Sequence, residues 1–118
     1  MGNKMRNIGE IKIENAAAAT ISNIYMNNAC DLCTVQAFGS ATAMQIKIQG
    51  MTDITSDEWQ DIAVFDLGTL ELSDGSDGIQ AAGVYAASIA GLKQIRINVI
   101  SVTGSVSVTA AFSDTSAN

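Results

Sequence analysis

Two cysteines stand in the chain at the spacing of a redox dithiol or of half a zinc site, in the segment Cys30-Asp31-Leu32-Cys33. A structural zinc ion needs about four ligands, and the sequence offers no histidine and no further cysteine. No predicted helix begins nearby to lower the pKa of either thiol. We expect buried, reduced structural cysteines; a disulfide or redox pair, and a metal site shared with another chain, are the alternatives.

Carboxylates are the second group that could do chemistry. Every ionisable side chain from Asp53 to Asp77 is acidic, and the turn Asp74-Gly75-Ser76-Asp77-Gly78 could offer calcium the oxygens of Asp74 and Asp77. The spacing is not that of an EF-hand loop, and the same residue types form ordinary solvated turns. We expect a solvated turn, with calcium at Asp74 and Asp77 as the alternative. No resident metal and no cofactor are predicted.

Catalysis is not predicted. The absence of histidine removes the side chain that most readily transfers protons near neutral pH, and no motif places a lysine beside a serine to activate it. Asp57 and Asp61 could in principle act as a glycosidase pair, but acidic runs are usually solvated faces. We therefore expect no catalytic residue and no enzyme.

Length and composition limit the number of domains and the kinds of partner that the chain can have. With 118 residues, 47% hydrophobic and 15% charged, the chain fits one domain with one core. The net charge of −6 disfavours nucleic acid as a partner, and no apolar run approaches the roughly 20 residues of a membrane-spanning helix. Lys4 and Arg6 precede no apolar segment, so we expect no secretory signal and synthesis in the cytoplasm.

Alternating apolar and polar residues predict strands rather than helices. The predicted strands are 10–14, 20–26, 32–38, 43–50, 59–65, 67–72, 83–89, 93–102 and 105–112. Turn residues recur about every ten positions and crossover helices are missing. The pattern predicts an all-β fold, an antiparallel β-sandwich or jelly roll of about eight strands. The last two strands, separated by Thr103-Gly104, are expected to pair as a hairpin.

The same alternation assigns the core. Gln45, Lys47 and Gln49 are expected to face water, and Trp59 is expected to cover the core where its strand begins. The predicted core residues are Ile46, Ile48, Trp59, Ile62, Val64, Ile95, Ile97, Val99, Val106 and Val108. The predicted organisation is a flexible N-terminal arm over 1–9, a single β-sandwich domain over 10–113 and a frayed tail over 114–118.

Several segments follow one another in an order typical of a known family. They are the strand Gln45-Ile46-Lys47-Ile48-Gln49-Gly50, an acidic loop leading to Trp59-Gln60-Asp61-Ile62, the turn Gly83-Val84-Tyr85, Ile89-Ala90-Gly91-Leu92, Gln94-Ile95-Arg96-Ile97-Asn98-Val99 and Gly104-Ser105-Val106-Ser107-Val108-Thr109. From about Thr34 to Phe112, the chain resembles the small jelly-roll structural proteins of tailed bacteriophage virions. Those proteins occur as head decoration, head-fibre and tail-associated proteins.

The resemblance implies a virion structural protein, a capsid decoration or head-fibre-type protein on the outer capsid surface. The alternative is a carbohydrate- or host-surface-binding module of a phage tail or fibre. The implied location is the virion, with protein made in the host cytoplasm, and the implied partner is the major capsid protein or another virion protein. Abundant apolar positions favour a homo-oligomer, and the resemblance favours a trimer. Neither nucleic acid nor a membrane is expected as a partner.

The N-terminal arm is the predicted contact segment. It carries Lys4 and Arg6, whereas the rest of the surface is mostly acidic. The residues expected to contact the capsid or a neighbouring subunit are Lys4, Met5, Arg6, Asn7 and Ile8.

Overall fold

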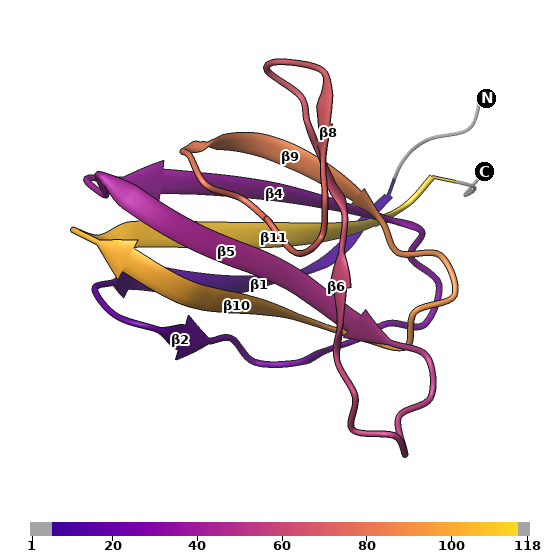
Figure 1. The fold of residues 1–118 in the computed structure, drawn as a ribbon. Helices are drawn as coiled ribbons and strands as arrows, with labels where there is room; N and C mark the ends of the chain where they lie inside the picture. The colour runs from indigo at the N-terminus through magenta and orange to yellow at the C-terminus, as the bar shows by residue number, and fades with distance from the viewer. Residues whose placement is uncertain (1–5, 116–118) are drawn as a thin grey trace.

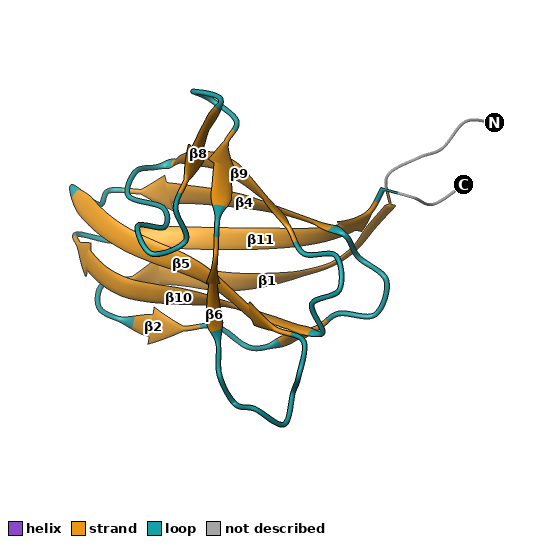
Figure 2. Ribbon diagram, turned by 45° about the vertical axis from the view of Figure 1, so that its right-hand side comes forward, coloured by secondary structure: helices purple, strands orange, loops and turns teal. Residues whose placement is uncertain are grey.

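A computed structural model describes residues 6–115, which form eleven strands in two antiparallel sheets (Figure 1). Strands and loops make up all of these residues, and none of them forms a helix (Figure 2). Correspondingly, no helix able to cross a membrane occurs in this part of the chain. The prediction of an all-β antiparallel sandwich is confirmed.

The strands fall into a six-stranded and a five-stranded sheet. The first sheet has the order β1 (Arg6–Ala16), β11 (Val106–Asp114), β4 (Leu32–Gly39), β9 (Gly83–Ser88), β7 (Val64–Asp66) and β8 (Glu71–Ser73). The second has the order β2 (Thr20–Ile21), β10 (Gln94–Thr103), β5 (Ala43–Met51) and β6 (Gln60–Ile62), and β3 (Tyr25–Met26) also pairs with β10. The chain passes repeatedly from one sheet to the other, which is the arrangement of a jelly roll.

Two of the nine predicted strand segments are each divided, which gives the eleven strands of the structure. The stretch 20–26 becomes β2 and β3. The stretch 59–65 becomes β6 and β7, which belong to different sheets and are joined by Ala63 alone. A strand that changes sheet in this way forms a corner of the sandwich. The alternation of apolar and polar residues continues across this corner, so the sequence gives no sign of it.

The last two strands do not form the predicted hairpin. β10 pairs with β2, β3 and β5, whereas β11 pairs with β1 and β4. Their connection therefore crosses between the sheets, beside the crossing from β4 to β5, and the Thr42 amide donates to the carbonyl of Thr103 over 2.9 Å. Alternation shows which face of a strand is buried but not which sheet it joins, so the hairpin prediction is wrong.

The core lies between the sheets and is built from the inward faces of their long strands. Its largest fully buried side chains are Phe112, Ile46, Ile48, Ile79, Ile89, Ile95, Ile97, Val35, Val64, Val99, Val106 and Val108. Ile62 packs against this cluster and is partly buried. Trp59 differs from the prediction because it is half-buried and lies outside the core cluster.

The two ends of the domain differ from the predicted boundaries. β1 begins at Arg6, which pairs with Asp114, so residues 6–9 are strand rather than arm. Ile8 is 48% exposed, and Lys4 and Met5 lie outside the described residues. Asp114, predicted to be in the frayed tail, is a buried part of β11. Pairing of β1 with β11 places these residues in strands, although their polar sequence does not predict a strand there.

Candidate functional site

A polar cluster covers the outer face of the second sheet where β6, β5 and β10 lie side by side. Pairing places Gln49 of β5 opposite Arg96 of β10 and opposite Asp61 of β6. Ile48, Ile95 and Ile97 point into the core; because side chains alternate along a strand, their neighbours emerge on the outer face. We call Lys47, Gln49, Asp61, Arg96 and Asn98 the Gln49 network.

Gln49 joins these side chains. Its amide nitrogen donates to Asp61 Oδ1 over 2.8 Å, and its Oε1 accepts from Arg96 Nε over 2.9 Å and from Asn98 Nδ2 over 3.2 Å. Lys47 Nζ lies 2.9 Å from Asp61 Oδ2. Gln49 is only 8% exposed, although alternation predicted that it faces water. The partners above it, brought in from two other strands, cover it.

Trp59 lies beneath Arg96, whose guanidinium carbon is 4.3 Å from the centre of the indole ring. A cation over an aromatic face is attracted by the ring's electron density. This contact explains why Trp59 belongs to the outer surface and not to the core. The sequence contains both residues, but their separation of 37 positions hides the contact, which depends on the pairing of β10 with β5 and β5 with β6.

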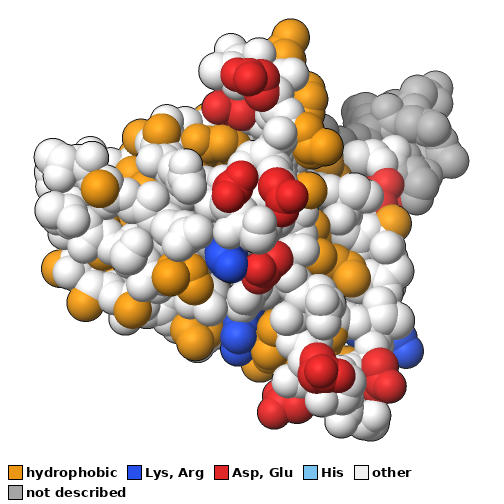
Figure 3. Space-filling view, in the orientation of Figure 1, with side chains coloured by type: hydrophobic (Ala, Val, Ile, Leu, Met, Phe, Trp, Pro, Cys, Tyr) orange, Lys and Arg blue, Asp and Glu red, His pale blue; other side chains and the backbone are white. Residues whose placement is uncertain are grey.

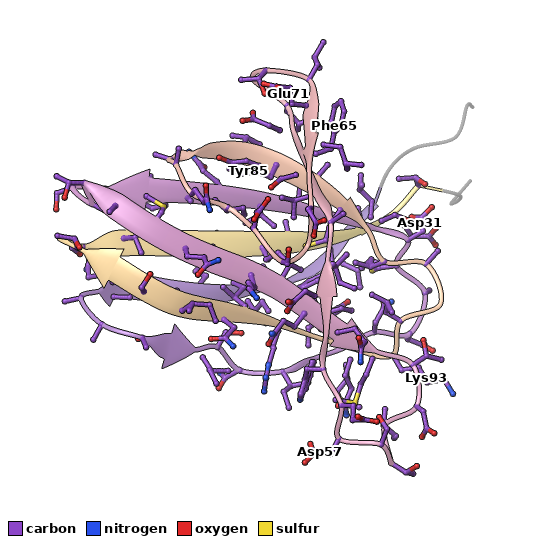
Figure 4. The ribbon with its side chains drawn as sticks, in the orientation of Figure 1. Asp31, Asp57, Phe65, Glu71, Tyr85 and Lys93 are labelled. Carbon is purple, nitrogen blue, oxygen red and sulfur yellow. The ribbon has the colours of Figure 1, made fainter. Side chains whose placement is uncertain are left out.

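The pairing of Asp57 with Asp61 as glycosidase carboxylates gains no support. Hydrogen bonds from Gln49 and then from Lys47 lower the pKa of Asp61, whereas a glycosidase acid needs a raised pKa. Asp57 lies away in the β5–β6 loop, which projects from the sandwich (Figure 4). Within the Gln49 network, Asp61 is held as a carboxylate by Gln49 and Lys47.

The acidic turn after β8 is held by its own hydrogen bonds. Asp74 Oδ1 accepts from the amide and the hydroxyl of Ser76 over 2.8 and 2.9 Å, and these bonds lower the pKa of Asp74. Asp74 and Asp77 both line a surface hollow of about 480 Å³. Within residues 6–115, no group of three or more Asp, Glu, Cys or His side chains is placed to hold a metal ion. The hydrogen bonds from Ser76 to Asp74 are those of a turn held by its own side chains, and calcium at Asp74 and Asp77 is not tested by them.

A second hollow, of about 470 Å³, lies at the end of the sandwich between the β3–β4 and β9–β10 connections. Asn27 joins these connections: its amide nitrogen donates to the carbonyls of Cys30 and Leu92 over 3.0 and 2.8 Å. Its carbonyl accepts from the Cys30 amide over 3.0 Å. Sequence reasoning did not identify this hollow, because its walls come from connections distant in the chain.

The cysteines at this end are free and buried. Cys33 faces the core on β4, and burial, together with the nearby Cys30, raises the pKa of its thiol to about 12. Cys30 lies 3.6 Å from the hydroxyl of Tyr25, and the pKa of Tyr25 is also raised to about 12, mainly by burial. Because a thiolate is the reactive form of cysteine, these conditions favour packing over redox chemistry.

Charge is unevenly distributed over the surface. Figure 3 shows acidic side chains on the upper and lower projections of the molecule and also in the middle of the same face, where basic side chains lie beside them. Lys47 and Arg96 of the Gln49 network are two of the four basic residues whose side chains the structure describes; the others are Lys12 and Lys93. The outer face of β6, β5 and β10 is therefore the candidate binding surface.

Two solved structures share this fold. The SPBc2 prophage-derived protein YomS matches with a TM-score of 0.78 and 20% identity over 96% of this chain and 96% of its own. The PBSX exported protein XepA matches with a TM-score of 0.76 and 20% identity over 96% of this chain. The chain spans only 39% of the length of XepA. A comparison with curated protein sequences finds no match.

These findings correct the expectations drawn from the virion resemblance. The family model that matches is that of XepA, over residues 8–111, and not one of virion decoration or head-fibre proteins. The capsid decoration role and its tail or fibre alternative are therefore withdrawn. The contact with a neighbouring subunit expected for Lys4, Met5, Arg6, Asn7 and Ile8 stays a prediction. The virion location is withdrawn as well, since the PBSX relative is described as an exported protein. The turn and core pattern reflects a jelly roll, which unrelated proteins share.

The XepA model extends from β1 into β11 and so includes strands of both sheets and every member of the Gln49 network. The match over nearly the whole chain does not depend on the turns that the virion proteins also have. The chain belongs to the XepA family.

Proposed function

We propose that this chain is a prophage-encoded exported protein that acts outside the cytoplasm by binding and not by catalysis. The observation that carries the proposal is the XepA family match over residues 8–111. Further support comes from two relatives of the same fold, one described as prophage-derived and one as exported. Because the chain spans 39% of XepA, the role proposed is that of a single β-sandwich module.

The non-catalytic part of the proposal is supported by the chemistry of the chain. It contains no histidine, the pKa of Cys33 is raised by burial, and the pKa of Asp61 is lowered. These conditions are the reverse of those that activate a thiol nucleophile or a carboxylic acid. The acidic net charge supports the exclusion of nucleic acid as a partner.

Cell fractionation tests the export. The full chain, produced in growing bacteria, is expected in the medium or the cell envelope while a cytosolic marker enzyme remains inside the cells. Immunoblotting of each fraction gives the distribution. Recovery of the chain entirely with the cytosolic marker, in cells that have not lysed, would contradict the proposal.

The proposed partner is a second copy of the chain. The hairpin of β7 and β8 projects from the sandwich (Figure 1), and Leu70 and Leu72 on it are each 70% exposed. Large apolar side chains that are this exposed at a projecting edge are typical of association surfaces. The charge of the neighbouring Glu71 disfavours non-specific pairing of this edge strand with strands of other proteins. The trimer came only from the virion resemblance and is not part of the proposal.

Sedimentation equilibrium tests self-association and gives the number of subunits. The wild-type chain is expected to be an oligomer, and the double variant Leu70→Ser, Leu72→Ser is expected to shift toward monomer. The matched control is Ile21→Ser, Ile24→Ser, which removes apolar side chains that are 54% and 48% exposed near the other sheet. A wild-type monomer at all concentrations, or equal weakening by both double variants, would contradict this assignment.

A further inference from the structure

Arg96 carries hydrogen-bond donors that the fold does not use. A guanidinium has five N–H donors, and in Arg96 one of them, Nε, donates to Gln49 Oε1 over 2.9 Å. Neither terminal nitrogen has a hydrogen-bond partner among the residues whose side chains the structure describes (8–115), and no carboxylate among them forms an ion pair with Arg96. The terminal edge of the guanidinium is therefore free to bind another group.

The surroundings hold this edge in one place. Trp59 lies under the guanidinium at 4.3 Å, and Gln49, which accepts from Nε, is itself held by Asp61 over 2.8 Å and by Asn98 over 3.2 Å. A free arginine side chain loses rotamer entropy when it is ordered. Here the ring and the amide order it before any ligand arrives, which lowers the cost of binding.

Charge at the site favours an anion despite the negative net charge of the chain. Asp61 is the only carboxylate in the Gln49 network, and it is paired with Lys47 Nζ at 2.9 Å. The hydrogen bond from Gln49 occupies its other oxygen. The positive charge of Arg96 is consequently not cancelled within the network.

We propose that Arg96, stacked on Trp59 and oriented by Gln49, binds an oxyanion that presents two oxygens to the guanidinium edge. Phosphate and carboxylate groups share this geometry, and arginine binds both through paired hydrogen bonds. Lys47 does not contact the ligand in this site; it keeps Asp61 neutralised. The inference goes beyond the proposed export and self-association and does not depend on either.

Trp59 is the single tryptophan of the chain, so its fluorescence reports on the site directly. The wild-type protein is titrated with sodium phosphate and, in parallel, with sodium acetate, each against sodium chloride at matched ionic strength. A saturable change with phosphate, with acetate or with both, and none with chloride, is expected. The two arms separate a phosphate ligand from a carboxylate ligand. No saturable response to either salt overturns the proposal.

Substitutions assign the response to Arg96. Arg96→Gln is expected to weaken binding about tenfold or more, because it removes the charge-assisted hydrogen bonds, and Arg96→Lys to weaken it as well, because the planar fork is lost. Lys93→Gln is the matched control: it removes the same charge from an exposed residue of the β9–β10 connection and is expected to bind as the wild type does. Thermal denaturation verifies that each variant is folded. Equal binding by Arg96→Gln and the wild type overturns the proposal.

Discussion

Replacing Phe112 with alanine is expected to lower the free energy of unfolding by about 3–5 kcal/mol, the range for a large aromatic removed from a core. Phe112 is fully buried at the end of β11, and its ring is stacked on Tyr25 with the ring centres 3.8 Å apart and an angle of 3° between the planes. Tyr25 belongs to β3, which pairs with the second sheet. The substitution therefore opens a cavity and removes a contact that joins the two sheets.

Urea denaturation followed by circular dichroism measures the loss. Phe38→Ala is the matched control, since Phe38 lies on the adjacent β4 and is 48% exposed. Its loss is expected to stay near or below about 0.5 kcal/mol, as for most surface substitutions. Similar losses for both variants would show that the Tyr25–Phe112 stack does not support the core.

The second large effect is expected for Gly78→Ala. Gly78 has a φ of +67°, and a Cβ there would lie 2.3 Å from the carbonyl oxygen of Ile46. That oxygen accepts from the Ile79 amide over 2.7 Å, and the Ile46 amide donates to the Ile79 carbonyl over 2.9 Å. A left-handed backbone costs a non-glycine residue about 1–2 kcal/mol, and loss of the two hydrogen bonds adds about 0.5–1.5 kcal/mol for each. We expect a total loss of about 3 kcal/mol or more.

Gly91→Ala separates the two causes. Gly91 also has a positive φ, +85°, but an added Cβ would meet nothing within 4 Å. Its loss is expected to be only the backbone cost of about 1–2 kcal/mol, measured in the same urea series. If the two alanine variants lose the same stability, the contact between Gly78 and Ile46 is not as close as the structure has it.

Most of the strands could be predicted because their signal is local. In the segment 43–50, Met44, Ile46 and Ile48 alternate with polar residues, and all three are buried in β5. An apolar face with a period of two can be recognised from consecutive residues. Burial of that face contributes most of the favourable free energy of forming the sheet. The division of the strand at Ala63 could not be predicted, since a change of sheet leaves the alternation intact.

The candidate site is the opposite case. Gln49, Asp61 and Arg96 each look like an ordinary polar residue on the wet side of a strand. Their value as a site depends on the pairing of β5 with both β6 and β10, which is a contact between residues far apart in the chain. The same holds for Trp59: its aromatic character suggested the core, and only the position of Arg96 explains its place outside.

The sequence alone was sufficient for the all-β class, the approximate strand positions and most of the inward-facing residues of the long strands, because local alternation and turn chemistry determine them. The tertiary structure alone decided which strands share a sheet, that β10 and β11 do not pair, and that Trp59 and Arg96 meet above Gln49. The physical reason is that one alternating pattern serves equally well in either sheet. Which sheet a strand joins depends on how both sheets pack on the shared core. That packing involves contacts between distant segments and cannot be recognised from any one of them.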